Sequence, residues 1–276
     1  MILFKRHQDD ENGSDDGHYY ISISDLMTSL LFIFILILTY VMLSFVEKED
    51  VLTVEIKKVE QKVDELEKKK DILSDEIKKI EQNIEHRGEL LQDLQEELLG
   101  QDINVEIDKE NGNMRLKSDL LFGSGSADIS VEGKRQIGEI AKLLMVKMIE
   151  PKYQMAIDTI FIEGHTDTVP IRVSRGFRAQ WSNKELSAQR AINTYSEMLI
   201  ATDNKINALK NKKEKHLLSY SGYASTRQLC NENELKQVDM PVSNELKLCR
   251  SKNRRIEFYF TVNTPDVKKM KEHIND

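Results

Sequence analysis

The sequence is poor in the features that mark metal-binding, nucleic-acid-binding or hydrolytic proteins. It has only two cysteines, Cys230 and Cys249, no Cys-x-x-Cys motif, and scattered histidines such as His165 and His216, so a zinc site is not expected. Its net charge is -7 and no basic stripe stands out, which argues against a nucleic-acid partner. The sequence shows no recognisable pairing of a catalytic nucleophile with a general base, which a hydrolase would need. We therefore expect no enzymatic activity, no cofactor and no metal.

The apolar residues are concentrated near the N-terminus, although 32% of the 276 residues are charged. The run from Leu26 to Val46 carries no charge, and at ~1.5 Å per residue it would be roughly 31 Å long, about the thickness of a hydrocarbon core. A cleaved signal peptide is the alternative. However, acidic residues precede the run and "VMLSFVEKED" offers no small-residue cleavage site. The pattern predicts a single uncleaved transmembrane helix over residues 19–46.

The charges that flank this run do not fix its orientation. Lys5 and Arg6 precede it, whereas Lys48, Lys57, Lys58 and Lys62 follow it closely. Taken literally, the positive-inside rule would place the C-terminal side in the cytoplasm, but long folded domains are translocated largely regardless of charge. Other features must therefore decide the orientation.

Residues 47–100 have a heptad pattern of apolar residues among Glu, Lys, Asp and Gln, which predicts a dimeric coiled-coil spacer. β-Branched residues at a positions and leucine at d positions favour a parallel dimer. Lys70 and Arg87 interrupt the seam, and Gly88 is an expected soft point. A lone charged helix is the alternative. The a positions are Ile56, Val63, Ile77 and Ile84, and the d positions are Leu52, Leu66, Leu73 and Leu94.

Beyond Gly100 the pattern changes to that of a mixed domain. "INVEIDKENGNMRLKS" alternates on both sides of an Asn-Gly turn and predicts a hairpin. Residues 131–149 and 182–200 predict amphipathic helices, the second capped by Ser182 or Asn183. Strands are expected over residues 156–164, 216–222 and 254–262. The fold class is therefore α+β, with an α/β sandwich that has helices on one face of a mixed sheet.

Five ordered blocks in this region carry a family resemblance: "LLFGSGSADIS", "IEGHTDTVPI", "NKELSAQRA", "SGYAS" and "KNRRIEF". Together they resemble the OmpA-like peptidoglycan-binding domain over residues 101–262, which leaves residues 263–276 as a C-terminal tail. The resemblance implies binding of the diaminopimelate-bearing peptide of the bacterial wall. That ligand carries both an ammonium and a carboxylate, so its site needs a carboxylate and a guanidinium.

The family's binding roles map onto individual residues of this chain. By resemblance, Asp167 accepts the ligand ammonium and Arg190 binds its carboxylate, because the arginine fork can bind a carboxylate with two hydrogen bonds. The positions expected to line the site are Thr166, Asn183 and Leu186, with Arg254 as an added positive group. The alternative is a local ion pair between Asp167 and Arg190, with Asn183 as a helix cap.

The resemblance also bears on orientation and on the cysteines. The longer loop "TVPIRVSRGFRAQWS" looks like the MotB-type stator branch, although its Trp181 is displaced and "GYASTRQL" lacks a proline common in relatives. A wall-binding domain lies in the periplasm, so residues 1–18 would be a cytoplasmic acidic tail and the chain a single-pass inner-membrane protein. In that compartment Cys230 and Cys249 are expected to pair, and two inert thiols are the alternative.

An acid, Asp25, stands at the start of the apolar run. One interpretation is that Asp25 is a helix N-cap at the headgroup boundary. Tyr19 and Tyr20 suggest instead an aromatic belt that would place Asp25 deeper, on a polar stripe with Ser22, Thr28 and Ser29. A carboxylate in that position is costly unless it faces protein, water or a bound ion.

"SDLMTSLLFIFILIL" resembles the ion-carrying helix of MotB-type stator subunits, most closely those of the Zorya anti-phage defence system, whose branch the acidic "DDENGSDD" also favours. The resemblance implies that Asp25 carries H⁺ or Na⁺ within a homodimer surrounded by five MotA-like A subunits. The chain would then be the wall-anchored subunit of an ion-driven motor. A flagellar stator subunit and a passive wall anchor without ion conduction are the alternatives.

Overall fold

The computed structural model describes residues 15–171, 182–235 and 242–265, with side chains from Ser24 onward. The predictions for residues 1–14 of the acidic tail, for Trp181 and most of its loop, and for nearly all of the C-terminal tail lie outside these residues. Residues 15–18 of the predicted tail are part of a helix. The chain divides into two compact units, Met1–Asp71 and Ile72–Asp276. Each unit is described separately below.

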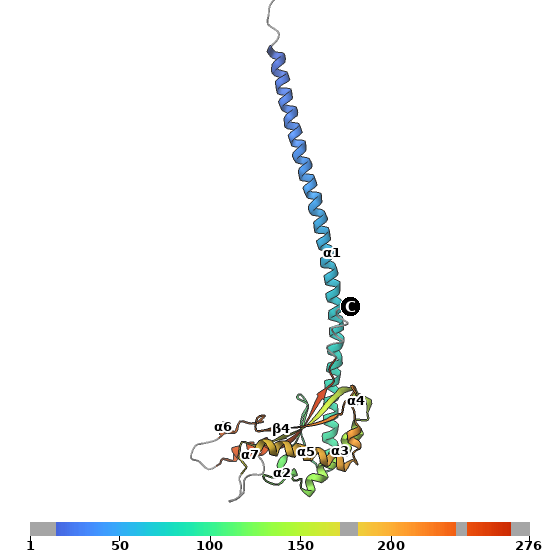
Figure 1. Cartoon of the computed structure of the whole chain (residues 1–276), viewed down its shortest axis with the longest axis vertical. Helices are drawn as coiled ribbons and strands as arrows, with labels where there is room; N and C mark the ends of the chain where they lie inside the picture. The colour runs from blue at the N-terminus through green and yellow to red at the C-terminus, as the bar shows by residue number, and fades with distance from the viewer. Residues whose placement is uncertain (1–14, 172–181, 236–241, 266–276) are drawn as a thin grey trace, which may run out of the picture. The chain divides into compact units, whose positions relative to one another are not determined.

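Helix α1, Asp15–Leu99, supplies all of the described structure of the first unit (Figure 1). Its apolar segment reaches a mean hydropathy of 2.6 over an 18-residue window, and none of that window is buried within the protein. Length and composition therefore suffice for one membrane crossing. Thr39 and Ser44 donate their hydroxyls to main-chain carbonyls of the preceding turn, which satisfies these polar groups within the helix.

The heptad residues of α1 beyond the apolar segment remain exposed in the single chain. The helical conformation predicted for residues 47–100 is present, apart from Gly100 itself, which follows the last residue of α1. The dimeric coiled coil stays a prediction, because its partner would have to cover this stripe. The exposed positions are Leu52, Ile56, Val59, Val63, Leu66, Leu73, Ile77 and Ile84.

The second unit is built on a five-stranded mixed sheet. Its strand order is β1-β2-β5-β3-β4, and only the β3–β4 pair is parallel. The predicted hairpin is formed by β1 and β2, with Gly112 at a φ of 76° in its turn, a conformation that favours glycine. The strands are β1 Glu106–Asp108, β2 Asn113–Lys117, β3 Ile157–His165, β4 Leu218–Ala224 and β5 Arg255–Val262.

Two longer helices cover one face of this sheet. Helix α5, Asn183–Ala201, connects the parallel strands and packs against both, and helix α3, Val131–Lys147, packs against α5 (Figure 1). Ser130 caps α3, and Ser182 forms a capping box with Glu185 at the start of α5. The predicted mixed sheet with helices is thus confirmed.

Several further elements were not predicted, and all of them except the ten-residue α7 span too few turns to show an apolar period. They are α2 Ser118–Leu121, α4 Pro151–Ala156, the 3₁₀ helix η1 Lys205–Ala208, α6 Glu232–Leu235 and α7 Asn244–Asn253.

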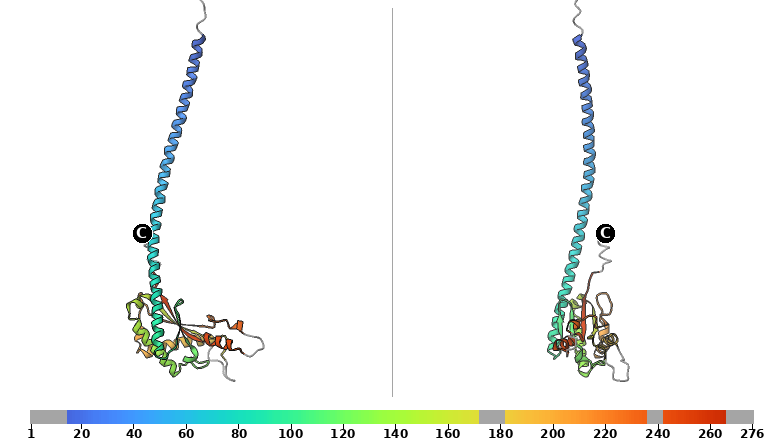
Figure 2. Two further views of the ribbon diagram at one scale, coloured as in Figure 1. Left: turned by 180° about the vertical axis from the view of Figure 1, so that it is seen from behind. Right: turned by 90° about the vertical axis from the view of Figure 1, so that its left-hand side faces the viewer.

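The hydrophobic core extends further toward the N-terminus than the predicted boundary at residue 101. Leu90, Leu91, Leu94 and Leu98 of α1 are fully buried and belong to the same core cluster as the sheet residue Phe258. Figure 2 shows these last turns of α1 lying against the sheet domain. The heptad pattern here serves packing within the chain, because an apolar helical stripe can face a sheet as well as another helix.

Arg87 takes part in this packing instead of only interrupting a coiled-coil seam. Its guanidinium donates hydrogen bonds to the carbonyl oxygens of Phe260 at 3.3 Å, Lys109 at 3.4 Å and Glu110 at 2.8 Å. A cation that joins three main-chain carbonyls ties α1 to the hairpin and to β5.

Candidate functional site

Two glycines bring α5 close to the sheet beside the predicted site. Gly164 of β3 and Gly222 of β4 are partners in the parallel register. A Cβ atom on Gly164 would overlap the Ser187 carbonyl, and one on Gly222 would overlap the main-chain nitrogen of Ala188. Because neither strand has a side chain at this point, α5 packs directly against the two strand backbones. The segment that follows Gly164 therefore emerges beside the N-terminal turns of α5.

That segment is then fixed by hydrogen bonds to β4. The main-chain N–H of Thr166 donates to the Ala224 carbonyl at 2.9 Å. Ala224 in turn donates its N–H to the Ser187 hydroxyl of α5 at 3.0 Å. Strand, helix and the "GHTD" segment are thus held in one arrangement.

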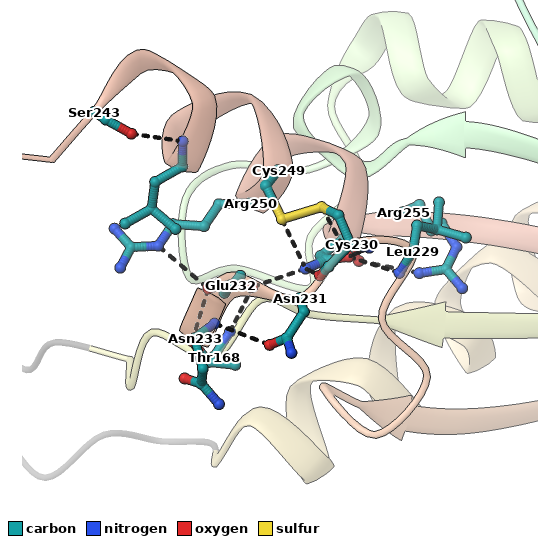
Figure 3. The surroundings of a disulfide bond; sticks show 12 residues. Thr168, Leu229, Cys230, Asn231, Glu232, Asn233, Ser243, Cys249, Arg250 and Arg255 are labelled. Carbon is teal, nitrogen blue, oxygen red and sulfur yellow. Dashed lines mark hydrogen bonds and ion pairs between the residues drawn. A yellow bond between two sulfur atoms is a disulfide. The ribbon is translucent and has the colours of Figure 1, made fainter. Parts of the chain in front are cut away.

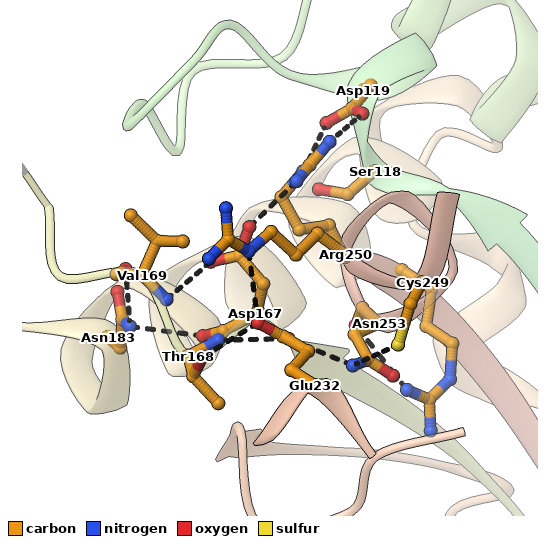
Figure 4. A network of polar contacts seen from close by, with 12 residues as sticks. Ser118, Asp119, Asp167, Thr168, Val169, Asn183, Glu232, Cys249, Arg250 and Asn253 are labelled. Carbon is orange, nitrogen blue, oxygen red and sulfur yellow. Dashed lines mark hydrogen bonds and ion pairs between the residues drawn. The ribbon is translucent and has the colours of Figure 1, made fainter. Parts of the chain in front are cut away.

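Asp167 has its two carboxylate oxygens in different contacts and is only 8% exposed. Oδ1 accepts from the main-chain N–H of Val169 at 3.0 Å, and Oδ2 accepts from Arg254 Nη1 at 2.7 Å. Asn183 donates to the carbonyls of Asp167 and Val169 at 3.2 and 3.0 Å (Figure 4). Asn183 therefore shapes the loop that carries Asp167.

Arg254 is shared between two acids. Its Nε and Nη2 donate to the carboxylate of Asp119 at 2.9 and 2.6 Å, while Nη1 holds Asp167. These bonds, first with Asp119 and then with Asp167, raise the pKa of Arg254 further above its ordinary value. Arg254 is therefore a permanent cation between two carboxylates.

Arg190 is 4% exposed and faces the loop after α2. Its guanidinium donates to Ser118 Oγ at 2.8 Å and to the carbonyls of Ser126 and Gly123 at 2.9 and 3.2 Å. Burial lowers the pKa of Arg190 to about 10, so it remains charged at neutral pH. Three of its five N–H groups are engaged by these contacts. The remaining two can serve a ligand.

The alternative of a local Asp167–Arg190 ion pair with Asn183 as a helix cap is not what the structure contains. Among the described residues, the ion-pair partner of Asp167 is Arg254, and Arg190 bonds to uncharged groups. The N-cap of α5 is Ser182. The side chain of Asn183 is consequently available for the Asp167 loop.

The two remaining predicted positions, Leu186 and Thr166, are both buried. Leu186 is 3% exposed and lies on the buried side of α5, so it supports the site from within. The Thr166 hydroxyl is buried and has no hydrogen-bond partner among the described residues. This leaves a polar group next to Asp167 with unused hydrogen-bonding capacity.

Ser118 and Asp119 are site residues that the sequence analysis missed. They link Arg190 to Arg254, since one accepts from the first arginine and the other from the second. Both directly precede the "LLFGSGSADIS" block. Their position beside a recognised block is the signal that could have identified them.

Near the start of α1, the hydroxyls of Thr28 and Ser29 each donate to the Asp25 main-chain carbonyl, at 2.9 and 2.8 Å. Thr28 also donates to the Ser24 carbonyl. The two hydroxyls thus lie within one turn of Asp25, and their support of ion binding stays a prediction. The side chain of Ser22 lies outside the part that the structure describes.

Cys230 and Cys249 form a disulfide, as expected, with a Cα–Cα distance of 5.8 Å (Figure 3). It joins the segment before α6 to α7 and closes a loop between β4 and β5. A disulfide is stable in an oxidising compartment and rare in the cytosol.

Glu163, His165 and Glu257 form a buried cluster whose ligand-type atoms lie within 4.8 Å of one another. Both ring nitrogens of His165 lack a hydrogen-bond partner among the described residues, and burial lowers its pKa. The cluster has the residue types of a cation site, but guanidinium groups already compensate its carboxylates. Arg227 pairs with Glu163, while Arg115 and Arg255 both pair with Glu257. Arg115 also pairs with Asp108, so three guanidinium groups balance three carboxylates and leave no negative charge for a divalent cation. The cluster is better explained as an internal ion network.

Comparison with known proteins adds the following similarities. No family model matches the sequence. Zorya protein ZorB of Escherichia coli is 28% identical over 177 residues, which cover 63% of this chain and 65% of ZorB. The chain therefore spans somewhat less than two thirds of that relative.

Solved structures with a similar fold include a MotB-like protein from Desulfovibrio vulgaris, with a TM-score of 0.46, 19% identity, and coverage of 68% of this chain and 98% of that one. The periplasmic domain of Helicobacter pylori MotB has a TM-score of 0.40, 27% identity, and coverage of 59% and 83%. The cell wall anchor of the Pseudomonas aeruginosa T6SS has a TM-score of 0.43, 19% identity, and coverage of 63% and 97%. The resemblance predicted from the sequence is confirmed in the similarity of this chain to Zorya protein ZorB.

Proposed function

We propose that the second unit of this chain binds the diaminopimelate-bearing peptide of peptidoglycan and anchors a membrane-embedded stator subunit. The observation that carries this proposal is the contact between Arg254 and Asp167, flanked by Asn183 and Arg190. These residues come from separate blocks of the sequence and meet beside the N-terminal turns of α5. A guanidinium and a carboxylate side by side suit a ligand that carries both an ammonium and a carboxylate.

The role of each side chain in ligand binding follows from the hydrogen bonds that it can still form. Asp167 has spare lone pairs on both oxygens, so it can accept a ligand ammonium while Val169 and Arg254 stay bound. A ligand carboxylate can bind Arg254 in competition with Asp119, and it can also use the two remaining N–H groups of Arg190.

The membrane part of the proposal concerns Asp25. A carboxylate among the apolar residues of α1 is costly unless an ion or a partner compensates it. We assign to Asp25 the binding of the transported H⁺ or Na⁺, with Ser22, Thr28 and Ser29 in support. A MotA-like A subunit, five copies around two of this chain, would surround it. Ion flow would turn the ring while the wall-bound domain holds this subunit still.

Orientation and pairing complete the proposal. The Cys230–Cys249 disulfide and a wall ligand both support a periplasmic second unit, and the N-terminus would then lie in the cytoplasm. The exposed apolar stripe of α1 from Leu52 to Ile84 would be covered by a second copy in a parallel coiled coil. The similarity to ZorB supports a role in Zorya-type anti-phage defence.

The wall-binding part is tested with the detergent-solubilised full chain and purified peptidoglycan sacculi in a sedimentation assay. Asp167→Asn keeps the side-chain shape but removes the negative charge, so we expect at least a tenfold loss of affinity. Asp203→Asn, which removes an equal charge from a side chain 86% exposed, is the control and should bind normally. Equal sedimentation of the wild type and Asp167→Asn would refute this assignment.

The ion-carrying part is tested in cells that express this chain together with the proposed MotA-like A subunit. Asp25→Asn should abolish phage protection while leaving the membrane level of the chain unchanged on an immunoblot. Full protection by Asp25→Asn would favour a passive wall anchor.

A further inference from the structure

Glu232 of α6 is a fully buried acid, 0% exposed, that belongs to none of the predicted site residues. Four donors surround its carboxylate. Oε1 accepts from the Thr168 main-chain N–H at 3.1 Å and from Asn253 Nδ2 at 2.9 Å. Oε2 accepts from the Thr168 hydroxyl at 2.7 Å and from Arg250 Nε at 3.3 Å (Figure 3). Such a complete set of donors is needed to keep a buried carboxylate ionised.

Two of these four donors belong to Thr168, the residue directly after Asp167. Figure 4 shows the Glu232 carboxylate pointing toward Thr168, with Asp167 and Asn183 alongside. Because both the main chain and the side chain of Thr168 bind one carboxylate, the path of the chain leaving Asp167 is fixed. A shift of Glu232 would therefore move the loop that carries Asp167.

Asn253 connects the same carboxylate to the disulfide. Its side chain accepts from the Leu229 N–H at 2.9 Å and donates to the Cys230 carbonyl at 3.1 Å. Cys230 is in turn bonded to Cys249 of α7. The disulfide thus holds both ends of the segment from which Glu232 projects.

The loop that carries Asp167 and Thr168 is consequently joined to the end of α7 through two successive residues. Arg254 binds Asp167, and its neighbour Asn253 binds Glu232, which binds Thr168. The first link is a direct ion pair in the site. The second passes through a residue that no ligand can reach, because Glu232 has no exposed surface.

We propose that Glu232 is a positioning residue for the peptidoglycan-binding loop: it fixes Thr168, and so the direction of the Asp167 carboxylate, from a segment held in place by the Cys230–Cys249 disulfide. This role rests on the proposed function. Glu232 acts on the ligand only through Thr168 and Asp167. The disulfide contributes by keeping Glu232 within reach of Thr168.

The test measures binding of the detergent-solubilised full chain to peptidoglycan sacculi, below the unfolding temperature of every variant. Glu232→Gln keeps the side-chain size but puts an amide group where the Thr168 and Arg250 donors converge, so a loss of affinity of about tenfold is expected. Thr168→Val, which lacks the hydroxyl, should lose part of this affinity, and Thr168→Ser should retain it. Glu234→Gln on the same short helix, an exposed acid, is the matched control.

A purely structural role of Glu232 is distinguished by combining variants and by amide exchange. If Glu232 acts through Thr168, the double variant Glu232→Gln with Thr168→Val should bind no more weakly than Glu232→Gln alone. Hydrogen exchange of the Thr168 amide should be faster in Glu232→Gln and unchanged in Glu234→Gln. If the affinity losses of the two single variants multiply in the double variant, or if Glu232→Gln binds as well as wild type, the positioning role is overturned.

The disulfide is tested with the double variant Cys230→Ser and Cys249→Ser. It should weaken binding several-fold and speed exchange of the Thr168 amide in the same direction as Glu232→Gln. Faster unfolding with unchanged binding and unchanged Thr168 exchange would remove the disulfide from the proposal. Failure of the wild-type chain to bind sacculi would instead refute the proposed function itself, and with it the ligand role of Glu232.

Discussion

Arg254 Nη1 lies 2.7 Å from Asp167 Oδ2, so the acid expected to receive the ligand ammonium already has a cation beside it. The same guanidinium reaches Asp119 through its other nitrogens. A charged network that is complete without ligand sets two requirements for binding. In the proposed binding mode, the ligand ammonium would share Asp167, and the ligand carboxylate would displace Asp119 or use Arg190.

Asp119→Asn should therefore strengthen binding to peptidoglycan. Asp119 competes with the ligand carboxylate for Arg254, and its side chain is half exposed. Exposed ion pairs contribute about 0–1 kcal/mol, so the gain should be at most about fivefold in affinity. Sacculus sedimentation measures it, with Asp203→Asn as the control. Weaker binding would indicate that Asp119 holds the ligand ammonium instead.

Arg190→Ala should unfold more easily as well as bind less. Removing its guanidinium leaves Ser118 Oγ and the carbonyls of Gly123 and Ser126 without their donor, at a cost of about 2–3 kcal/mol. Arg190→Lys keeps the charge but cannot reproduce the planar fork, so it should lose less stability. Chemical unfolding of the solubilised chain separates the two effects. Equal stability of Arg190→Ala and wild type would contradict this structural role.

Gly164→Ala should destabilise the second unit. The added methyl would overlap the Ser187 carbonyl, and forcing α5 away from the sheet costs about 1–3 kcal/mol or more. Gly88→Ala is the control, because its Cβ would meet no atom within 4 Å and alanine favours the helix by about 1 kcal/mol. The midpoint of thermal unfolding should fall for Gly164→Ala and should not fall for Gly88→Ala.

Arg87→Met should reduce stability by about 1–3 kcal/mol, since the carbonyls of Phe260, Lys109 and Glu110 would lose a buried donor. Lys70→Met, at the other interruption of the heptad pattern, lies on an exposed part of α1 and should leave the unfolding of the second unit unchanged. Similar unfolding curves for both variants would argue that Arg87 does not tie α1 to the sheet.

The stability of the second unit should fall in acid partly through Glu232. Burial alone would raise the pKa of this acid, but hydrogen bonds from Thr168, Asn253 and Arg250 outweigh it and hold the pKa below the usual glutamate value. A group with a depressed pKa stabilises the fold fully above its unfolded-state pKa of about 4.3 and loses that contribution as the pH falls through the folded-state value. Unfolding free energies measured from pH 7 to pH 3 should therefore converge for wild type and Glu232→Gln. A constant difference would contradict an ionised Glu232.

The sequence predicts those elements whose local signals agree with their final packing. Helices α3 and α5 show an apolar period, α5 also shows a serine cap, and the hairpin shows an Asn-Gly turn at which Gly112 takes a positive φ. The last turns of α1 are different. The spacing of Leu91, Leu94 and Leu98 suits a coiled coil and a sheet equally, and only the contacts decide between them.

The candidate site was predictable in its members more than in its connections. Asp167, Asn183 and Arg254 meet as the resemblance implies. The partners of Arg190 could not be predicted, because two of them are main-chain carbonyls, which any residue can supply. Glu232 escaped notice because its importance comes from complete burial, and a single acid in a polar segment gives no sign of that.

The burial of Leu90, Leu91, Leu94 and Leu98 has a mechanical consequence. A force applied to the last turns of α1 acts on side chains packed in the core and on the hydrogen bonds of Arg87 to three main-chain carbonyls. This junction therefore has no flexible hinge that could absorb a twist. Detaching this end of the helix would require opening the same hydrophobic core that supports the loops proposed to bind peptidoglycan.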